Sequence, residues 1–254
     1  MPSKDTSEPK PLTGEILFEP GDFHALGDRL AKDPQYNDRR LVARRKLLAL
    51  AKRVSKSLAA EPGLKLDVRS SLHHPHAFNG MRVGRLWSSL FRVKSDKQKL
   101  KRVLGPELAK DLDSAHKNAC LVLSMTDADL RVSFEVGPDA WYDGQNLKKR
   151  IAAEGLDGWL AELNRLDGFS LRMHDWKGEW SCGSLTTDRL EEYLGYYVPG
   201  EHRLKVERSW PVTGPTLDIA CGPGVTDSLA DELARLAPLY RFVAWSAEAD
   251  FLFS

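Results

Sequence analysis

The chain has 254 residues, of which 42% are hydrophobic and 29% are charged; this is typical of a soluble globular protein with one large domain or two small ones. No apolar run approaches the roughly 20 residues that cross a bilayer, and the opening MPSKDTSEPKP lacks the apolar segment of a secretory signal. Three widely spaced cysteines argue against a disulfide framework and favour a reducing, cytoplasmic compartment. We expect residues 1–11 to form a disordered leader and no membrane to be involved.

The first half of the chain changes from helical to strand patterns. Apolar residues at helical spacing predict a helix that starts near Gly21 and a long helix over residues 39–60, which Pro62 and Gly63 end. Another helix is expected over residues 97–112. Alternating or β-branched segments predict strands over residues 64–72, 82–93, 121–125 and 130–136.

Helices and strands alternate more closely in the second half. Asp143 is a candidate cap for a helix that Gly155 ends, and Thr186 or Thr187 is a candidate cap for another. Further helices are expected over residues 156–168 and 226–238, and strands over residues 169–176, 202–210, 217–220 and 240–246. These segments predict one α+β domain over residues 12–254, with a largely antiparallel sheet and a weak candidate boundary near Gly137.

Three segments resemble a bacterial family of single-domain α+β proteins of unknown function. They are FEPGDFHAL near the start, DGQNLKKRI in the middle and LARLAPLYRFVAW near the end. The resemblance implies the same α+β architecture. It implies no catalytic residue, so the sequence leaves open whether the protein is an enzyme.

The net charge of +1 conceals a strong asymmetry. Residues 1–110 hold 23 Lys and Arg against 12 Asp and Glu, whereas residues 111–254 hold 14 against 24. Two basic runs in the first half predict a surface that binds nucleic acid or another polyanion, such as an acidic protein. The candidate binding residues are Arg39, Arg40, Arg44, Arg45, Lys46, Arg53, Arg82, Arg85, Arg92 and Trp87, the last by stacking on a base.

Two other interpretations of these runs stay open. Trp87 and Phe91 could be core residues on one face of a strand, with the basic residues outward. The acidic second half of the same chain could also neutralise the basic first half. No helix-turn-helix, zinc-finger or RNA-binding motif accompanies the runs.

The segment SLHHPHAF suggests a metal-dependent hydrolase as one alternative function. His74 and His76 would share one face of a strand, a spacing that some metal sites use. A third ligand would have to come from elsewhere, such as Asp143, His174 or Asp175. Exposed polar surface is the simpler expectation, and we expect no metal.

The segment LDIACGPGV, residues 217–225, resembles the first motif of S-adenosylmethionine-dependent methyltransferases. The resemblance implies a buried strand that ends beside Asp218, a turn at Gly222 and Gly224 that admits the cofactor, and Glu248 at the ribose hydroxyls. The family continues through several more strands, whereas only residues 225–254 follow here. We therefore expect no cofactor and interpret the segment as a turn that starts the last helix.

Overall fold

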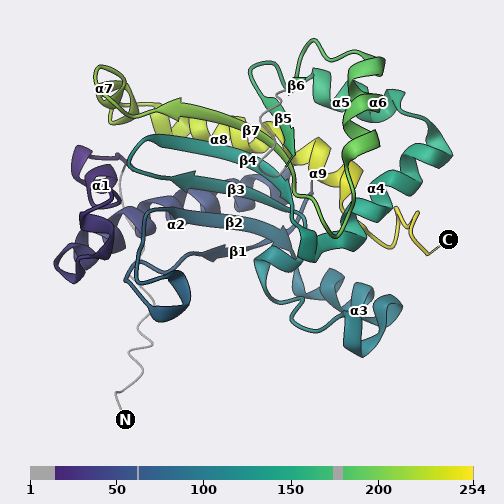
Figure 1. The fold of residues 1–254 in the computed structure, drawn as a ribbon, viewed down its shortest axis with the longest axis horizontal. Helices are drawn as coiled ribbons and strands as arrows, with labels where there is room; N and C mark the ends of the chain where they lie inside the picture. Colours follow the sequence, from purple (N-terminus) through teal and green to yellow (C-terminus); the bar gives the residue numbers. More distant parts are fainter. Residues whose placement is uncertain (1–14, 62, 174–179, 254) are drawn as a thin grey trace.

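The computed structural model describes residues 15–61, 63–173 and 180–253, so the expected leader lies outside the described residues. One seven-stranded sheet forms its centre, in the order β1-β2-β3-β4-β7-β5-β6 (Figure 1), and each of these pairings is antiparallel. The strands are β1 (Leu66–Ser70), β2 (Leu86–Arg92), β3 (Cys120–Met125), β4 (Asp129–Val136), β5 (Ser170–Met173), β6 (Trp180–Ser181) and β7 (Leu204–Pro211).

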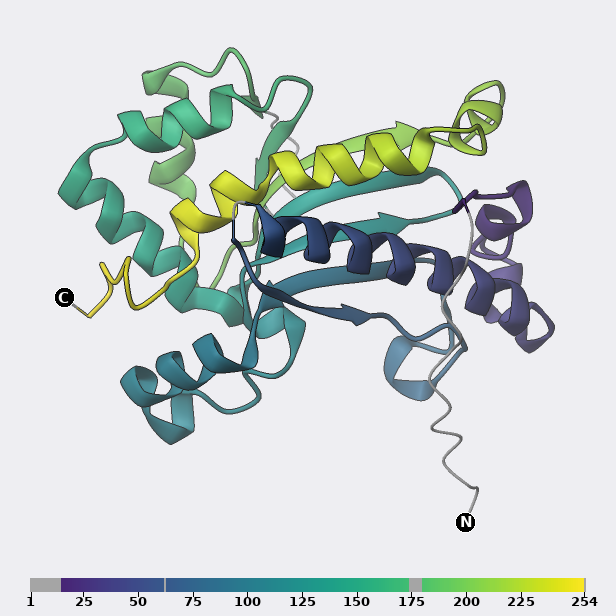
Figure 2. The same cartoon turned by 180° about the vertical axis from the view of Figure 1, so that it is seen from behind.

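Two long helices cover one face of this sheet. In Figure 2, α2 and α8 lie side by side across the strands, while Figure 1 looks onto the opposite face of β1 to β4, which none of the helices in the described ranges crosses. The remaining helices surround the ends of the sheet. The helices are α1 (Pro20–His24), α2 (Asn37–Ala60), α3 (Lys94–Leu108), α4 (Trp141–Glu154), α5 (Asp157–Asn164), α6 (Thr187–Tyr196), α7 (Thr216–Ala220), α8 (Val225–Arg235) and α9 (Ala237–Val243).

The hydrophobic core lies between the sheet and the α2–α8 layer. Along β4, Val132 and Phe134 are fully buried on the helical side, and they alternate with Arg131, Ser133 and Glu135 on the other side. Strands with one apolar and one polar face are expected in an antiparallel sheet that is covered on one side. The expected α+β fold with a largely antiparallel sheet is therefore confirmed. Strands from both sides of Gly137 join the one sheet.

Most expected elements are present, and two expected strands are wrong. Residues 217–220 belong to the short helix α7, and residues 240–243 belong to α9. Both segments are short apolar runs, whose length and composition do not distinguish a strand from part of a buried helix. Residues 174–176, expected to end the strand that is β5, lie outside the described residues. In the described ranges, no helix has the length and apolar character needed to cross a membrane.

Candidate anion-binding face of the sheet

Arg40, a candidate surface residue of the sequence, is fully buried and organises the loops around the start of α2. Each of its five N–H groups donates a hydrogen bond, so its charge is satisfied entirely inside the protein. Burial lowers the pKa of Arg40 despite the proximity of Asp33. The acceptors are the carbonyl oxygens of Ala25, Leu30, Asp33 and His73 and the Oδ1 atom of Asn37.

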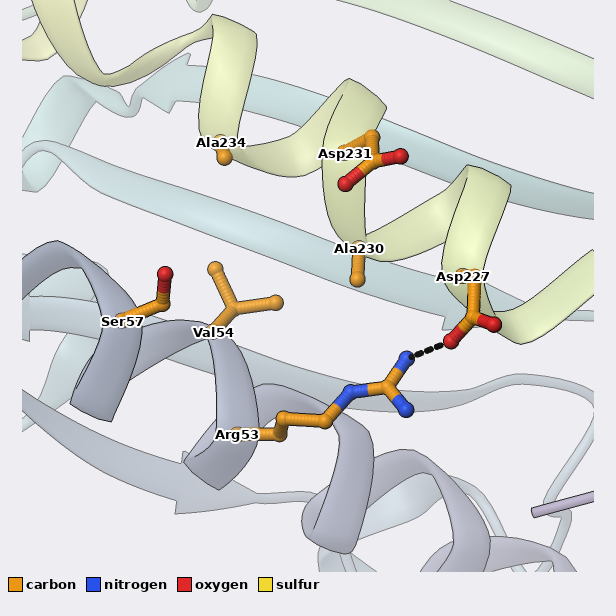
Figure 3. A pocket seen from close by; sticks show the side chains of 7 residues that line it. All are labelled: Arg53, Val54, Ser57, Asp227, Ala230, Asp231 and Ala234. Atoms are coloured by element: carbon orange, nitrogen blue, oxygen red, sulfur yellow. Dashed lines mark ion pairs between the residues drawn. The ribbon is translucent and has the colours of Figure 1, made fainter. Parts of the chain in front are cut away.

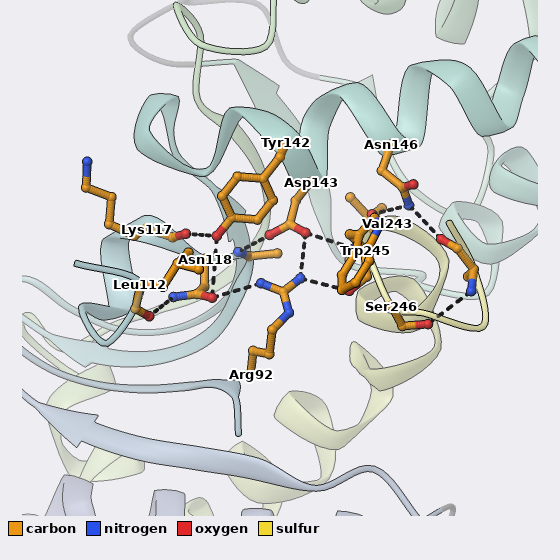
Figure 4. Close-up of polar contacts among 12 residues, drawn as sticks. Arg92, Leu112, Lys117, Asn118, Tyr142, Asp143, Asn146, Val243, Trp245 and Ser246 are labelled. Carbon is orange, nitrogen blue, oxygen red and sulfur yellow. Dashed lines mark hydrogen bonds and ion pairs between the residues drawn. The ribbon is translucent and has the colours of Figure 1, made fainter. Parts of the chain in front are cut away.

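Lys46 and Arg92 are also buried, so with Arg40 they are not available to an external polyanion. Lys46 pairs with the buried Asp22 at 2.7 Å. Arg92 pairs with Asp143 at 2.7 Å and donates to Asn118 Oδ1 (Figure 4). The sequence does not separate these residues from their exposed basic neighbours, because most of the groups that bind them come from other elements.

Asp143 also differs from its expected role as a helix cap. Helix α4 begins two residues earlier, at Trp141, and the Asp143 carboxylate accepts hydrogen bonds from the backbone N–H groups of Ala119 and Trp245 as well as from Arg92. These bonds join β2, the start of β3, α4 and the segment after α9 (Figure 4). The network is a buried structural junction.

The other candidates on α2 lie at the surface or partly exposed. Arg39 pairs with Glu19 at 2.8 Å, Arg53 pairs with Asp227 at 2.8 Å, and Arg44 donates to the carbonyl oxygen of Ser71. Arg45 is half-buried, and its Nε atom lies buried without a hydrogen-bond partner. Several basic residues of the first half are thus neutralised within the protein, some of them by acids of the second half, such as Asp143 and Asp227.

A further concentration of cations lies on the uncovered face of the sheet. Side chains on alternate positions of neighbouring strands form rows there, because residues paired across an antiparallel ladder project to the same side. Among the described residues, the strands and the segments just before them place six cationic side chains and four carboxylates on this face, which we call the open sheet face. The cations are Arg69, Arg85, Arg131, Arg172, Arg203 and Lys205, and the carboxylates are Asp67, Asp129, Glu135 and Glu207.

Glu135 lies at the centre of this arrangement. Its carboxylate accepts a hydrogen bond from Ser133 Oγ at 2.8 Å and pairs with Arg203 at 3.0 Å and Arg85 at 3.6 Å. Burial alone would raise the pKa of Glu135, but Arg85, Lys205, Ser133 and Arg203 together outweigh burial and lower the pKa. Glu135 is thus an ionised anchor for the arginines and is unsuited to donating a proton.

Glu207 has the same role on the neighbouring strand β7. Its carboxylate pairs with Lys205 at 2.6 Å and with Arg131 and Arg172 at 3.1 Å each. Like Glu135, Glu207 is almost completely covered although no helix of the described ranges crosses this face. The long cationic side chains therefore cover the carboxylates and present their own charge outward.

A hollow on the open sheet face brings together two of the predicted residues. Arg85 and Trp87 from β2 and its approach line it with Glu135 beneath. Trp87 is half-buried. Phe91, four residues further along the same strand, is buried in a small cluster under the segment around Ala115. The other charged or titratable side chains that line the hollow are Arg69, His116, Cys120 and Arg203.

Five cations of this face lie outside the two basic runs, so the sequence does not single them out: Arg69, Arg131, Arg172, Arg203 and Lys205. They are distributed over β1, β4, β5, β7 and the approach to β7. The alternation of polar and apolar residues along each strand could have shown that they share one face. The order of the strands, which brings them together, is not visible in the sequence.

The last predicted residue, Arg82, lies outside the hollow and pairs with Asp28. The methyltransferase-like segment is likewise separate from the open sheet face. Asp218 is exposed on α7, so the buried strand that the resemblance requires is not formed. Gly224, with φ of 82°, is the N-cap of α8, and Glu248 pairs with Lys99 on α3 at 3.4 Å. Gly222 follows α7 in the turn that leads to α8, as expected for a turn that starts a helix.

The histidine segment packs as a cluster before β2. The ring centroids of His73 and His74 lie 4.9 Å apart, and those of His74 and His76 lie 4.2 Å apart. Burial, followed by the charges of His74 and Arg44, lowers the pKa of His73 to about 4. Within the described ranges, no group of three or more His, Cys, Asp or Glu side chains is placed to hold a metal ion. Of the suggested third ligands, Asp143 is engaged by Arg92, and His174 and Asp175 lie outside the described residues.

Comparison with known proteins adds no relative to these observations: no protein-family model matches the chain, and no curated protein matches it.

Proposed function

We propose that this chain is a non-catalytic binding protein that holds a single-stranded nucleic acid on the open sheet face. The observation that carries the proposal is the excess of cations there: six cationic side chains share the face with four carboxylates, and Arg69, Arg85 and Arg203 line one hollow. Arginine suits phosphate because its planar guanidinium group donates two parallel hydrogen bonds. A phosphate backbone is therefore a chemically matched ligand.

Trp87 favours a single strand over a duplex. Its half-buried indole lies in the same hollow as the arginines, and unpaired bases stack on such rings whatever their sequence. Reading a duplex would require an element that enters a groove. The basic helix α2 is poorly suited to that role, because Arg40 and Lys46 are buried in it and Arg39 and Arg53 are paired with acids.

The proposal is tested by fluorescence anisotropy with a labelled oligodeoxythymidine over a range of salt concentrations. We expect the double variant Arg69→Gln/Arg85→Gln to bind about tenfold more weakly and to reduce the salt slope by about 1.4, since roughly 0.7 counterions are released for each phosphate contact on single strands. Arg203 still pairs with Glu135 in this variant. Trp87→Leu should weaken binding with the salt slope unchanged.

The matched control is Arg39→Gln/Arg53→Gln, which removes two charges from α2. We expect it to leave oligonucleotide affinity unchanged within about twofold. Equal loss in both double variants would reject the open sheet face as the site, and absence of binding by the native protein at low salt would reject the function. A third outcome is that the arginine variant loses affinity as expected while Trp87→Leu binds as tightly as the native protein. The face would then bind phosphate without stacking bases, which would contradict the preference for single strands.

A further inference from the structure

The hollow on the open sheet face is closed at one end. Ala115 packs there with Phe91 and Val122, near the end of β2 and the start of β3. Arg69 joins this closing segment to β1, because its Nη1 atom donates to the carbonyl oxygen of Asp113 at 3.1 Å. Ala115 and its two neighbours in the sequence line the hollow. A strand of nucleic acid that follows the sheet face meets this segment as a wall, so the hollow suits the end of a strand better than its middle.

The hollow is lined by more cations than carboxylates. Arg69, Arg85 and Arg203 line it together with Glu135, so three positive charges against one negative charge leave an excess of two. Within the described ranges, the hydrogen bonds and ion pairs of each arginine use one terminal nitrogen atom. The second terminal nitrogen of each guanidinium group can therefore donate to a ligand while the pairs with Glu135 stay in place.

Two further carboxylates lie just outside the hollow, and lysines neutralise both. Lys97 pairs with Asp67 at 3.0 Å and with Asp113 at 3.3 Å. Lys101 lies 3.9 Å from the carboxylate of Asp113. Two lysines thus balance these two aspartates, so the positive excess of the hollow remains.

The groove between α2 and α8 has the opposite balance of charge. Its lining holds Arg53 together with Asp227 and Asp231 (Figure 3), and Arg53 pairs with Asp227 at 2.8 Å. The net charge of these three side chains is negative, which disfavours a phosphate group. A cationic excess is therefore not a general feature of the hollows on the described surface.

A terminal phosphate group matches the excess of two better than a phosphate within a strand. A phosphomonoester carries about −1.5 to −2 charges at neutral pH and three strong acceptor oxygens. A phosphate within a strand carries a single negative charge. Arginine is well suited to either group, because its planar donors form charge-assisted pairs with phosphate oxygens. Trp87 lines the same hollow and offers a ring on which the terminal base can stack.

We propose that the hollow binds the terminal phosphomonoester of a single strand, at its 5′ or its 3′ end, while the following nucleotides lie along the open sheet face. The inference rests on the proposed function, because the rest of the strand occupies that face. It adds a preference, since strands that end in a phosphate bind more tightly than strands that end in a hydroxyl. A free nucleoside monophosphate offers the same group without the strand and binds more weakly.

Fluorescence anisotropy tests this with oligodeoxythymidines that differ only at one end and carry the fluorophore at the other. One ends in a phosphate, one in the methyl ester of that phosphate and one in a hydroxyl. At low salt we expect the phosphate to increase affinity about tenfold over the hydroxyl. The methyl ester keeps one negative charge and should increase affinity by no more than about threefold. Both the 5′ and the 3′ series are measured, and a preference at either end supports the inference.

Two single variants locate the preference. Arg69 is exposed, and its hydrogen bond to the carbonyl oxygen of Asp113 is a single contact, so we expect Arg69→Gln to fold and to reduce the tenfold preference to about threefold or less. The matched control Arg172→Gln removes a charge of the open sheet face outside the hollow. It should leave the ratio of the two affinities unchanged. Circular dichroism confirms that both variants are folded.

Three results would overturn the inference while the proposed function stands. They are equal affinity of the native protein for phosphate and hydroxyl ends in both series, an equal loss of preference in the two variants, and displacement of the strand by thymidine monophosphate as effectively as by the phosphorylated oligonucleotide. The last result would assign the hollow to a small phosphate compound. Absence of binding by every oligonucleotide at low salt would instead reject the proposed function, and this inference with it.

Discussion

Arg92 on β2 and Asp143 on α4 form a buried ion pair with 2.7 Å between Nη2 and Oδ1. Arg92 Nη2 also donates to the carbonyl oxygen of Trp245, whose own N–H donates to Asp143. Three segments far apart in the sequence therefore meet at two side chains. Because both charges are removed from water, each is stabilised in the interior by its opposite charge on the other residue.

Removal of one member of this pair should destabilise the protein strongly. We expect Arg92→Met or Asp143→Leu to lower the free energy of unfolding by about 3–5 kcal/mol, since each leaves an uncompensated buried charge. The double variant removes both charges and should lose less than the sum of the two. Urea denaturation of the three variants measures this. If the loss in the double variant equals the sum of the two single losses, Arg92 and Asp143 do not stabilise the protein through their interaction.

Arg40 allows a more conservative test of a buried cation. Arg40→Lys keeps the charge but offers three donors to five acceptors, four of which are backbone carbonyl oxygens. We expect a loss of at least about 2 kcal/mol in unfolding free energy. The control Arg39→Lys, at an exposed pair with Glu19, should change stability by no more than about 0.5 kcal/mol. Equal, small effects would show that the Arg40 network is dispensable.

The comparison of Arg39 with Arg40 also shows how far the sequence can be interpreted. Alternating apolar and polar residues along β4 reveal a strand with one apolar face, because the side-chain period of a strand is local information. No comparable local pattern distinguishes the exposed Arg39 from the buried Arg40, which are adjacent in one basic run. The burial of Arg40 depends on four backbone acceptors 7 to 33 positions away, among them the carbonyl oxygen of His73.

The same limit applies to the candidate site. Trp87 and Arg85 lie in a basic segment of the sequence, but the hollow needs Arg203 as well, which lies just before β7, the neighbour of β4. Strand order depends on long-range pairing and is not encoded by any local pattern. Conversely, Leu217 belongs to a well-formed local motif that has become a short helix, since a five-residue apolar run is compatible with either structure.

His73 makes stability dependent on pH. Its pKa is lowered to about 4 in the folded protein, whereas the unfolded chain takes up the proton near pH 6.5. Between these values the unfolded state binds more protons, so stability is complete above pH 6.5 and declines as the pH falls toward 4. His73→Gln should flatten this part of the profile. The control His24→Gln, at an exposed position on α1, should show the same fall in stability between pH 6.5 and 4 as the native protein.

The profile is measured by urea denaturation at several pH values, with NMR titration of the His73 ring as the direct readout. The groups around His73 are His74, Arg40, Arg44 and Arg45, all of which oppose its protonation. A ring that titrates near 6.5 in the folded protein would contradict the prediction.

Glu135 should restrain anion binding on the open sheet face. Its carboxylate pairs with Arg85 and Arg203, so Glu135→Gln releases both cations from their internal counterion. We expect the variant to bind the oligonucleotide about threefold more tightly at low salt, with the gain disappearing as salt is raised. Anisotropy titration measures this, with Glu61→Gln at an exposed position after α2 as the control. Weaker binding would instead show that Glu135 must hold the arginines in place.

Gly144 and Gly195 predict opposite results for the same substitution. In an exposed helix, Gly→Ala stabilises by about 0.5–1 kcal/mol because it restricts the unfolded chain. A Cβ at Gly195 on α6 meets open space, so Gly195→Ala should show this gain. A Cβ at Gly144 on α4 would collide with the hydroxyl of Tyr197 and lie 3.0 Å from Cβ of Pro199. Gly144→Ala should therefore lose about 1–3 kcal/mol. Thermal and urea unfolding of both variants test the contrast, and a gain at both positions would mean that the segment after α6 yields without cost.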